Sequence, residues 1–370
     1  MSAPRLEIDL EKIYHNAREL VARLARRGIS VTGVTKATLG LADVANTFLR
    51  AGVTSLGDSR IENIEAMRRD LVPASMTMIR SPMISQVERV VMHADLSLNT
   101  EIEVIRRLSL AARKANRKHG VLLMVELGDL REGIMPVDLI DTVRATIALP
   151  NIVFEGIGTN LACRSGVSPD AGNMAVLSKL ADSIESTLGL PVNIVSGGNS
   201  ANLSWALSSG DTGRINDLRL GEAILLGRET LHRQPIEGLY TDAISLIAEV
   251  IESKVKPSKP TGKIAQTAFG EVPSVTDRGP VEQSILAIGM VDTDPCGLQA
   301  SANSSILGAS SDHLIVESGG RHLQVGSEMA FQVNYSALIR AMTSPFVTKV
   351  SKSLEGSMGG SAEHEAISNG

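Results

Sequence analysis

The sequence predicts an α/β protein: a (β/α)₈ TIM barrel followed by a smaller, mostly β C-terminal domain. In the first part of the chain, short β-branched or apolar runs alternate with segments of helical spacing, which is typical of a parallel sheet. Eight such units within roughly 220 residues fit a barrel, with a doubly wound sheet as the alternative. After Gly238 the strand-like runs continue without helices between them. The length of 370 residues is enough for two domains.

The barrel strands are expected at residues 31–36, 54–58, 76–80, 95–99, 121–127, 153–159, 192–197 and 214–220. The helices are expected at residues 10–27, 41–51, 61–69, 101–118 and 171–188. In the first helix, for example, Leu10, Ile13, Ala17, Leu20 and Leu24 recur at three- and four-residue steps and form one apolar face.

The second domain is expected to hold strands at residues 243–252, 284–291, 305–307, 314–317 and 330–333. Clusters of Gly, Pro, Ser and Asp separate these runs and indicate turns. We therefore expect a barrel over residues 1–237, a β domain over 238–350 and a flexible tail over 351–370, where apolar residues are few.

The composition excludes several classes of protein. Lys and Arg number 36 against 41 Asp and Glu, so the net charge of −5 does not favour binding to nucleic acid. Only 2% of the residues are aromatic, too few for a base-stacking surface. No apolar run approaches the length of a membrane span and no secretory signal is recognised, so we expect a cytoplasmic protein.

Most cysteines and histidines are expected to have structural roles. Cys163 and Cys296 are too few for a disulfide framework or a zinc site, and we expect them to be buried small hydrophobes. His313 follows an acid in a polar turn and is the histidine we single out as a site candidate. The remaining histidines are expected at the surface: His15, His93, His119, His232, His322 and His364.

Polar residues follow several of the predicted strands, where a barrel places its functional groups. Lys36 closes an apolar run, and it is either a Schiff-base nucleophile or a rim lysine that reaches solvent. The run 196–200, Ser-Gly-Gly-Asn-Ser, is either a phosphate loop or a tight turn with a polar cap. Arg214 and Arg219 are either anion ligands or partners of nearby carboxylates.

Eight fragments in register resemble the alanine racemase superfamily, and more narrowly its ornithine racemase branch. They cover almost the whole chain, from about residue 5 to 349: residues 33–36, 57–61, 127–134, 156–163, 196–200, 218–222, 307–313 and 334–338. The resemblance implies a barrel that binds pyridoxal 5′-phosphate, followed by a β domain.

The resemblance also implies roles for individual residues. Lys36 matches the lysine that binds the cofactor as a Schiff base and then moves a proton on one face of the amino-acid α-carbon. Arg219 matches an arginine that faces the pyridine nitrogen; because arginine stays protonated, it keeps this nitrogen neutral and weakens the ring as an electron sink. The other cofactor contacts implied are the phosphate cradle at Ser200, Gly221 and Glu222, a contact from Arg131 to the phenolic oxygen, and Asn160 at the position of a ring-stacking histidine.

Racemisation needs a second acid–base group on the opposite face. The superfamily uses a tyrosine from the β domain of a partner subunit, but this chain has Met290 at that position. The candidates are His313, Asp292 and Tyr335, and we favour His313 because its ordinary pKa is nearest neutrality. The turn at Ser311 and Asp312 matches the one that receives the substrate carboxylate.

The resemblance implies a homodimeric racemase for ornithine or another basic amino acid, with no metal. A buried ammonium group of such a substrate needs a carboxylate partner, and the candidates are Asp58, Glu126, Asp129, Glu132 and Asp292. Two alternatives remain: a lyase similar to D-threonine aldolases or D-serine dehydratases, and a non-catalytic pyridoxal phosphate carrier. The metal-holding His-x-Cys or His-x-Asp pair of such lyases is missing at 334–336, and the carriers lack a β domain.

Overall fold

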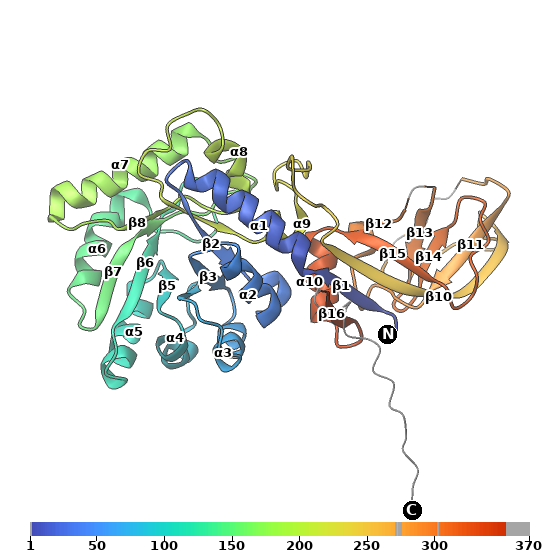
Figure 1. Cartoon of the computed structure of the whole chain (residues 1–370), viewed down its shortest axis with the longest axis horizontal. Coiled ribbons are helices and arrows are strands. Elements are labelled where there is room, and N and C mark those ends of the chain that lie inside the picture. The colour runs from blue at the N-terminus through green and yellow to red at the C-terminus, as the bar shows by residue number, and fades with distance from the viewer. Residues whose placement is uncertain (1, 271, 273–275, 302, 353–370) are drawn as a thin grey trace, which may run out of the picture. The chain divides into compact units, whose positions relative to one another are not determined.

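The computed structural model describes residues 2–270, 272, 276–301 and 303–352. The chain divides into two compact units, one formed by Ile13–Thr241 and the other by Met1–Lys12 together with Asp242–Gly370 (Figure 1). None of the helices in the described residues is long and apolar enough to cross a membrane.

The unit Ile13–Thr241 is the predicted (β/α)₈ barrel. Its strands, each parallel to the next, are β2 (Ser30–Val34), β3 (Ser55–Asp58), β4 (Met76–Met78), β5 (Leu96–Asn99), β6 (His119–Met124), β7 (Ile152–Gly158), β8 (Ile194–Ser196) and β9 (Asp217–Leu220). β9 pairs back onto β2, with Val31 opposite Leu218. This pairing closes the sheet, so the barrel is confirmed and the doubly wound alternative is wrong.

The helices lie outside the strands (Figure 1). They are α1 (Leu10–Ala25), α2 (Ala42–Arg50), α3 (Ile61–Arg69), α4 (Val87–His93), α5 (Ile102–Lys114), α6 (Leu139–Ile147), α7 (Ala171–Leu188), α8 (Leu203–Ala206) and α9 (Glu222–Leu226). Apolar faces of these helices pack on the strands; Leu139 and Leu177, for instance, share a buried cluster with Val121 and Leu123. His119 also lies in this layer, buried at the start of β6, so the expectation that it is a surface residue is wrong.

The second unit is built on one sheet, in the order β12-β15-β10-β11-β14-β13, with β1 paired to β10 and β16 paired to β1. Its elements are β1 (Arg5–Asp9), β10 (Ile244–Pro257), β11 (Pro280–Leu286), β12 (Leu298–Gln299), β13 (Ser305–Ala309), β14 (Leu314–Glu317), β15 (Glu328–Val333), α10 (Tyr335–Thr343) and β16 (Thr348–Lys352). The expected mostly β architecture is therefore confirmed.

The division between the units differs from the expected one at both chain ends. We expected residues 1–12 in the barrel domain, but β1 pairs antiparallel with β10 and parallel with β16. Its alternating pattern, which buries Leu6 and Ile8, suits one face of this sheet. β16 extends to Lys352 and so includes the start of the expected tail, while residues 353–370 lie outside the described part of the chain.

Candidate active site

Lys36 lies directly after β2, exposed at the carboxyl end of the barrel. The residue before it is held in place: the Thr35 N–H donates to the Gly57 carbonyl at 3.0 Å, and the Thr35 hydroxyl donates to Asp58 Oδ2 at 2.8 Å. The other oxygen of Asp58 accepts from Asn63 Nδ2 at 3.0 Å and from the Arg60 N–H at 2.9 Å. Asp58 therefore fixes the backbone beside Lys36, and we do not place it at a substrate ammonium group.

Ser200, Gly221 and Glu222 meet where the loop after β8 approaches the start of α9. The buried Ser200 hydroxyl accepts from the Ala223 N–H at 3.2 Å. A Cβ on Gly221 would lie 2.9 Å from the Val34 carbonyl oxygen, so this close approach requires glycine. Burial raises the pKa of Glu222, and the charges of Arg233 and Lys36 oppose that shift, which means that Lys36 lies near Glu222.

The loop 196–200 is a tight, polar-capped turn as well as a candidate phosphate loop. The side chain of Asn199 accepts from the Ala201 N–H at 2.8 Å, and the Asn202 side chain accepts from the Asn199 N–H at 3.0 Å. Gly198 has a φ of +146°, in a region that L-residues rarely adopt. The turn that we considered as the structural alternative is thus present, and it places Ser200 at the barrel mouth.

Arg219 points into the barrel, and the residue is 6% exposed. Its Nη2 donates to the Thr159 carbonyl at 2.6 Å, and its Nη1 donates to the Ser196 hydroxyl. Burial lowers the pKa of Arg219, while the negative charge of Asp217 opposes this shift. Arginine has an ordinary pKa far above neutrality, so we treat Arg219 as a protonated group.

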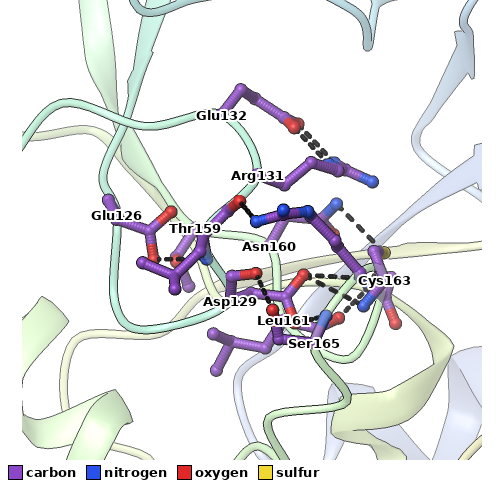
Figure 2. Close-up of polar contacts among 12 residues, drawn as sticks. Glu126, Asp129, Arg131, Glu132, Thr159, Asn160, Leu161, Cys163 and Ser165 are labelled. Carbon is purple, nitrogen blue, oxygen red and sulfur yellow. Dashed lines mark hydrogen bonds and ion pairs between the residues drawn. The ribbon is translucent and has the colours of Figure 1, made fainter.

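The loops after β6 and β7 are joined by one carboxylate (Figure 2). Asp129 accepts from the backbone N–H groups of Cys163 at 3.2 Å, Arg164 at 2.9 Å and Ser165 at 3.1 Å. Burial alone would raise the pKa of Asp129, but these hydrogen bonds lower it overall. Asp129 is thus a structural anchor between the two loops.

Asp129 brings Arg131 and Asn160 to the same side of the barrel mouth (Figure 2). Arg131 forms an ion pair with Glu132. The Asn160 amide contacts Arg131 when its oxygen is turned towards the guanidinium, and Asn199 Nδ2 lies 2.7 Å from the same amide. Arg131, Asn160 and the loop 196–200 are therefore neighbours.

The expectation that the two cysteines are buried is wrong. Both cysteines are exposed, and Cys163 Sγ lies 3.3 Å from Asn160 Nδ2, so this thiol is at the barrel mouth instead of in a core. Of the two alternatives for Arg214, the partner of nearby carboxylates is confirmed, because Arg214 forms ion pairs with Asp182 and Glu185 of α7 at 2.6 and 2.7 Å. Glu126, another candidate for the substrate ammonium, accepts from the N–H groups of Gly128 and Leu130 in its own loop.

The remaining candidates lie in the second unit. The Met290 and Val291 N–H groups donate to the carbonyls of Ser310 and Ser311 at 2.9 and 3.1 Å, so the turn with Asp312 and His313 lies against the loop after β11. Asp312 and His313 are exposed, and Tyr335 begins α10. Asp292 is buried and accepts from the Ser344 hydroxyl at 2.7 Å.

These residues fit pyridoxal 5′-phosphate. The barrel mouth offers a lysine for the aldehyde, a guanidinium inside the barrel for the ring, and a cradle at Ser200 and Gly221 that a Cβ would fill. Asp217, which is not among the residues expected at the site, accompanies Arg219 in the barrel interior and accepts from the Ser196 hydroxyl. The period-two alternation of β9, which puts residues 217 and 219 on one face, was the signal that could have found it.

Comparisons with known proteins identify the family of the chain. Residues 8–229 match the family described as "Alanine racemase, N-terminal domain". The chain is 37% identical over 351 residues to an ornithine racemase of Acetoanaerobium sticklandii, covering 94% of this chain and 99% of that protein. It is 38% identical over 353 residues to a lysine racemase of Thermotoga maritima, covering 95% and 99%.

Solved structures show the same fold at low sequence identity. An alanine racemase from Streptomyces lavendulae superposes with a TM-score of 0.74 at 18% identity, covering 96% of this chain and 99% of that one. A D-threonine aldolase from Filomicrobium marinum has a TM-score of 0.72 at 15% identity, covering 92% and 88%. The barrel, the β unit and the near-complete match to two racemases lead to one conclusion: this chain belongs to the alanine racemase family.

Proposed function

We propose that this protein interconverts the L- and D-forms of a basic amino acid of the ornithine or lysine type. Its family membership makes it a pyridoxal phosphate-dependent amino-acid racemase. The choice of substrate class is supported by the two relatives, an ornithine and a lysine racemase, that match along nearly their whole length. The observation that carries the proposal is an exposed lysine at the barrel mouth combined with a guanidinium fixed inside the barrel.

When bound, pyridoxal phosphate supplies a carbonyl that condenses with amines and a ring that withdraws electrons from the α-carbon. Lys36 would hold the cofactor and would move the α-proton on one face. Arg219 would keep the ring nitrogen unprotonated, which would favour simple removal and return of a proton over side reactions. The Ser200 hydroxyl and the backbone at Gly221 and Glu222 would hold the phosphate, while Arg131 and Asn160 would contact the ring.

On the second face we propose that His313 moves the proton. Its ring lies on an exposed turn, 3.5 Å from the Ser310 hydroxyl. Of the other two candidates, Asp292 is buried against Ser344, which favours His313 over it. Tyr335 remains the second choice, because a tyrosine needs a strongly lowered pKa for this task. The backbone at Ser311 and Asp312 receives the substrate carboxylate.

The proposal includes a cytoplasmic homodimer, in which the β domain of one subunit completes the site of the other. Sedimentation equilibrium of the cofactor-loaded protein tests the dimer, and cell fractionation tests the location. A monomer with full racemase activity would contradict the shared site.

Proton NMR of the cofactor-loaded protein in D₂O tests the activity, with L-ornithine, L-lysine, L-alanine and L-serine in separate tubes. We expect the α-proton signal of ornithine or lysine to disappear and chiral analysis to detect the D-form. Exchange with alanine alone would refute the basic specificity. No exchange in any tube, despite cofactor bound to Lys36, would move the assignment to a lyase or a carrier.

A further inference from the structure

A buried chain of hydrogen bonds runs through the barrel beneath Arg219. The Thr32 hydroxyl of β2 donates to Asp217 Oδ1 at 2.8 Å, and the Ser196 hydroxyl of β8 donates to Asp217 Oδ2. Ser196 in turn accepts from Arg219 Nη1, and Arg219 Nη2 donates to the Thr159 carbonyl at 2.6 Å. Every member is buried, with Asp217 at 8% and Ser196 at 1% exposure.

The direction of these hydrogen bonds depends on Asp217. A serine hydroxyl has one proton and two lone pairs. Because the Arg219 guanidinium can only donate, it occupies a lone pair of Ser196, and the Ser196 proton points at Asp217 Oδ2. Without an acceptor at position 217, the proton of the Ser196 hydroxyl loses its partner. The hydroxyl can then rotate, so that its lone pair no longer faces Arg219 Nη1.

Packing does not replace these hydrogen bonds. Asp217, Ser196 and Arg219 border a cavity of about 230 Å³ within the barrel, lined in part by the small polar residues Ser55, Ser75 and Thr77. Barrel interiors are ordinarily filled by layers of bulky side chains that leave little freedom. Arg219 lines this cavity, and its guanidinium is oriented by its hydrogen bonds to Ser196 and Thr159.

We infer that Asp217 is a positioning residue, which holds Arg219 in its orientation through the Ser196 hydroxyl. This inference rests on the proposed function, in which Arg219 faces the ring nitrogen of the cofactor. Misplacement of a group by about 1 Å can cost roughly 100-fold in rate. We therefore expect Asp217 to affect kcat, while the KM for the amino acid, which Asp217 does not contact, stays near the wild-type value.

Three variants separate positioning from a general structural role. Asp217→Ala removes the acceptor and Ser196→Ala removes the relay, so each lowers kcat by a factor approaching 100, and the double variant is no worse than either one because both act through one path. Asp217→Asn retains an oxygen acceptor for Ser196 and rescues most of the loss. Asp182→Ala is the matched control: Asp182 also hydrogen-bonds an arginine, Arg214, but on the outer helix α7.

The second readout is the ¹⁵N resonance of the ring nitrogen in protein loaded with labelled pyridoxal phosphate, together with far-UV circular dichroism of each variant. We expect this resonance to move in Asp217→Ala and Ser196→Ala and to stay in place in Asp217→Asn and Asp182→Ala. An unchanged resonance and kcat in folded Asp217→Ala, or additive losses in the double variant, would overturn the inference. If Asp217→Ala does not fold, the same test compares the kcat and the resonance of Ser196→Ala with those of Asp217→Asn. Equal values in these two variants would then overturn the inference. Wild-type protein without α-proton exchange would instead refute the proposed function.

Discussion

The buried ring of His119 makes the stability of the barrel depend on pH. The Nε2 of His119 lies 2.7 Å from the Ser97 hydroxyl, and burial lowers its pKa from 6.5 to about 4. An unfolded chain takes up a proton at this histidine as the pH falls through about 6.5, whereas the folded chain does so only near 4. The unfolded state therefore binds more protons in this window, and the barrel loses stability as the pH falls.

The size of this effect follows from the shift. A shift of about 2.5 pKa units corresponds to at most about 3 kcal/mol, of which about 2 kcal/mol is lost between pH 7 and pH 5. The assay is urea unfolding at both pH values, followed by the fluorescence of Trp205, the single tryptophan, in α8 of the barrel.

Substitution isolates the contribution of His119 from those of other titrating groups. His119→Gln does not titrate, so we expect the difference between pH 7 and pH 5 to shrink by about 2 kcal/mol relative to wild type. His232 is exposed, so His232→Gln serves as the control. We expect it to leave the difference in the free energy of unfolding between pH 7 and pH 5 unchanged. If His119→Gln shows the same pH dependence as wild type, the burial argument is refuted.

Four further predictions concern the site. Lys36→Ala removes the visible absorption band of the bound cofactor, whereas the control Lys114→Ala retains it. A borohydride-trapped adduct in Lys36→Ala would contradict the assignment of Lys36. Arg219→Glu protonates the ring nitrogen and raises transamination relative to racemisation; an unchanged product ratio counts against the contact. His313→Asn keeps the cofactor but loses racemisation in at least one direction, and normal rates both ways would transfer the role to Tyr335. Asp129→Ala leaves three backbone N–H groups without their acceptor and lowers the free energy of unfolding by about 3 kcal/mol in urea titration; an unchanged free energy of unfolding would contradict the anchoring role.

The fold was predictable from local patterns. Each barrel strand was expected within a few residues of its position, because strands buried on both faces read as apolar runs between amphipathic helices. The strands that were missed are short or distant from their partners. β1 pairs with β10 and β16, which lie at the other end of the chain, and no local pattern reports such a pairing.

The candidate site was predictable in its membership but less so in its roles. Residue type and position after a strand singled out Lys36, Ser200 and Arg219. These same signals also selected Asp58 and Asp129, whose carboxylates are in fact occupied by Thr35, Asn63 and backbone N–H groups. A sequence shows that a carboxylate is near a strand end, but not which donors surround it.

By itself, the sequence determined the alternation of strands and helices, the β domain and the family, since apolar periodicity and residue order are properties of the chain. The pairing of β9 with β2 decided that the sheet closes into a barrel. Only the tertiary structure decided which polar groups are paired. Asp217 became visible beside Arg219 and Ser196, and His119 proved to be buried, because hydrogen bonds and burial depend on residues far apart in the chain. Hydrophobic patterning can be recognised within a short segment of the sequence, whereas the environment of a charge is set by every element packed around it.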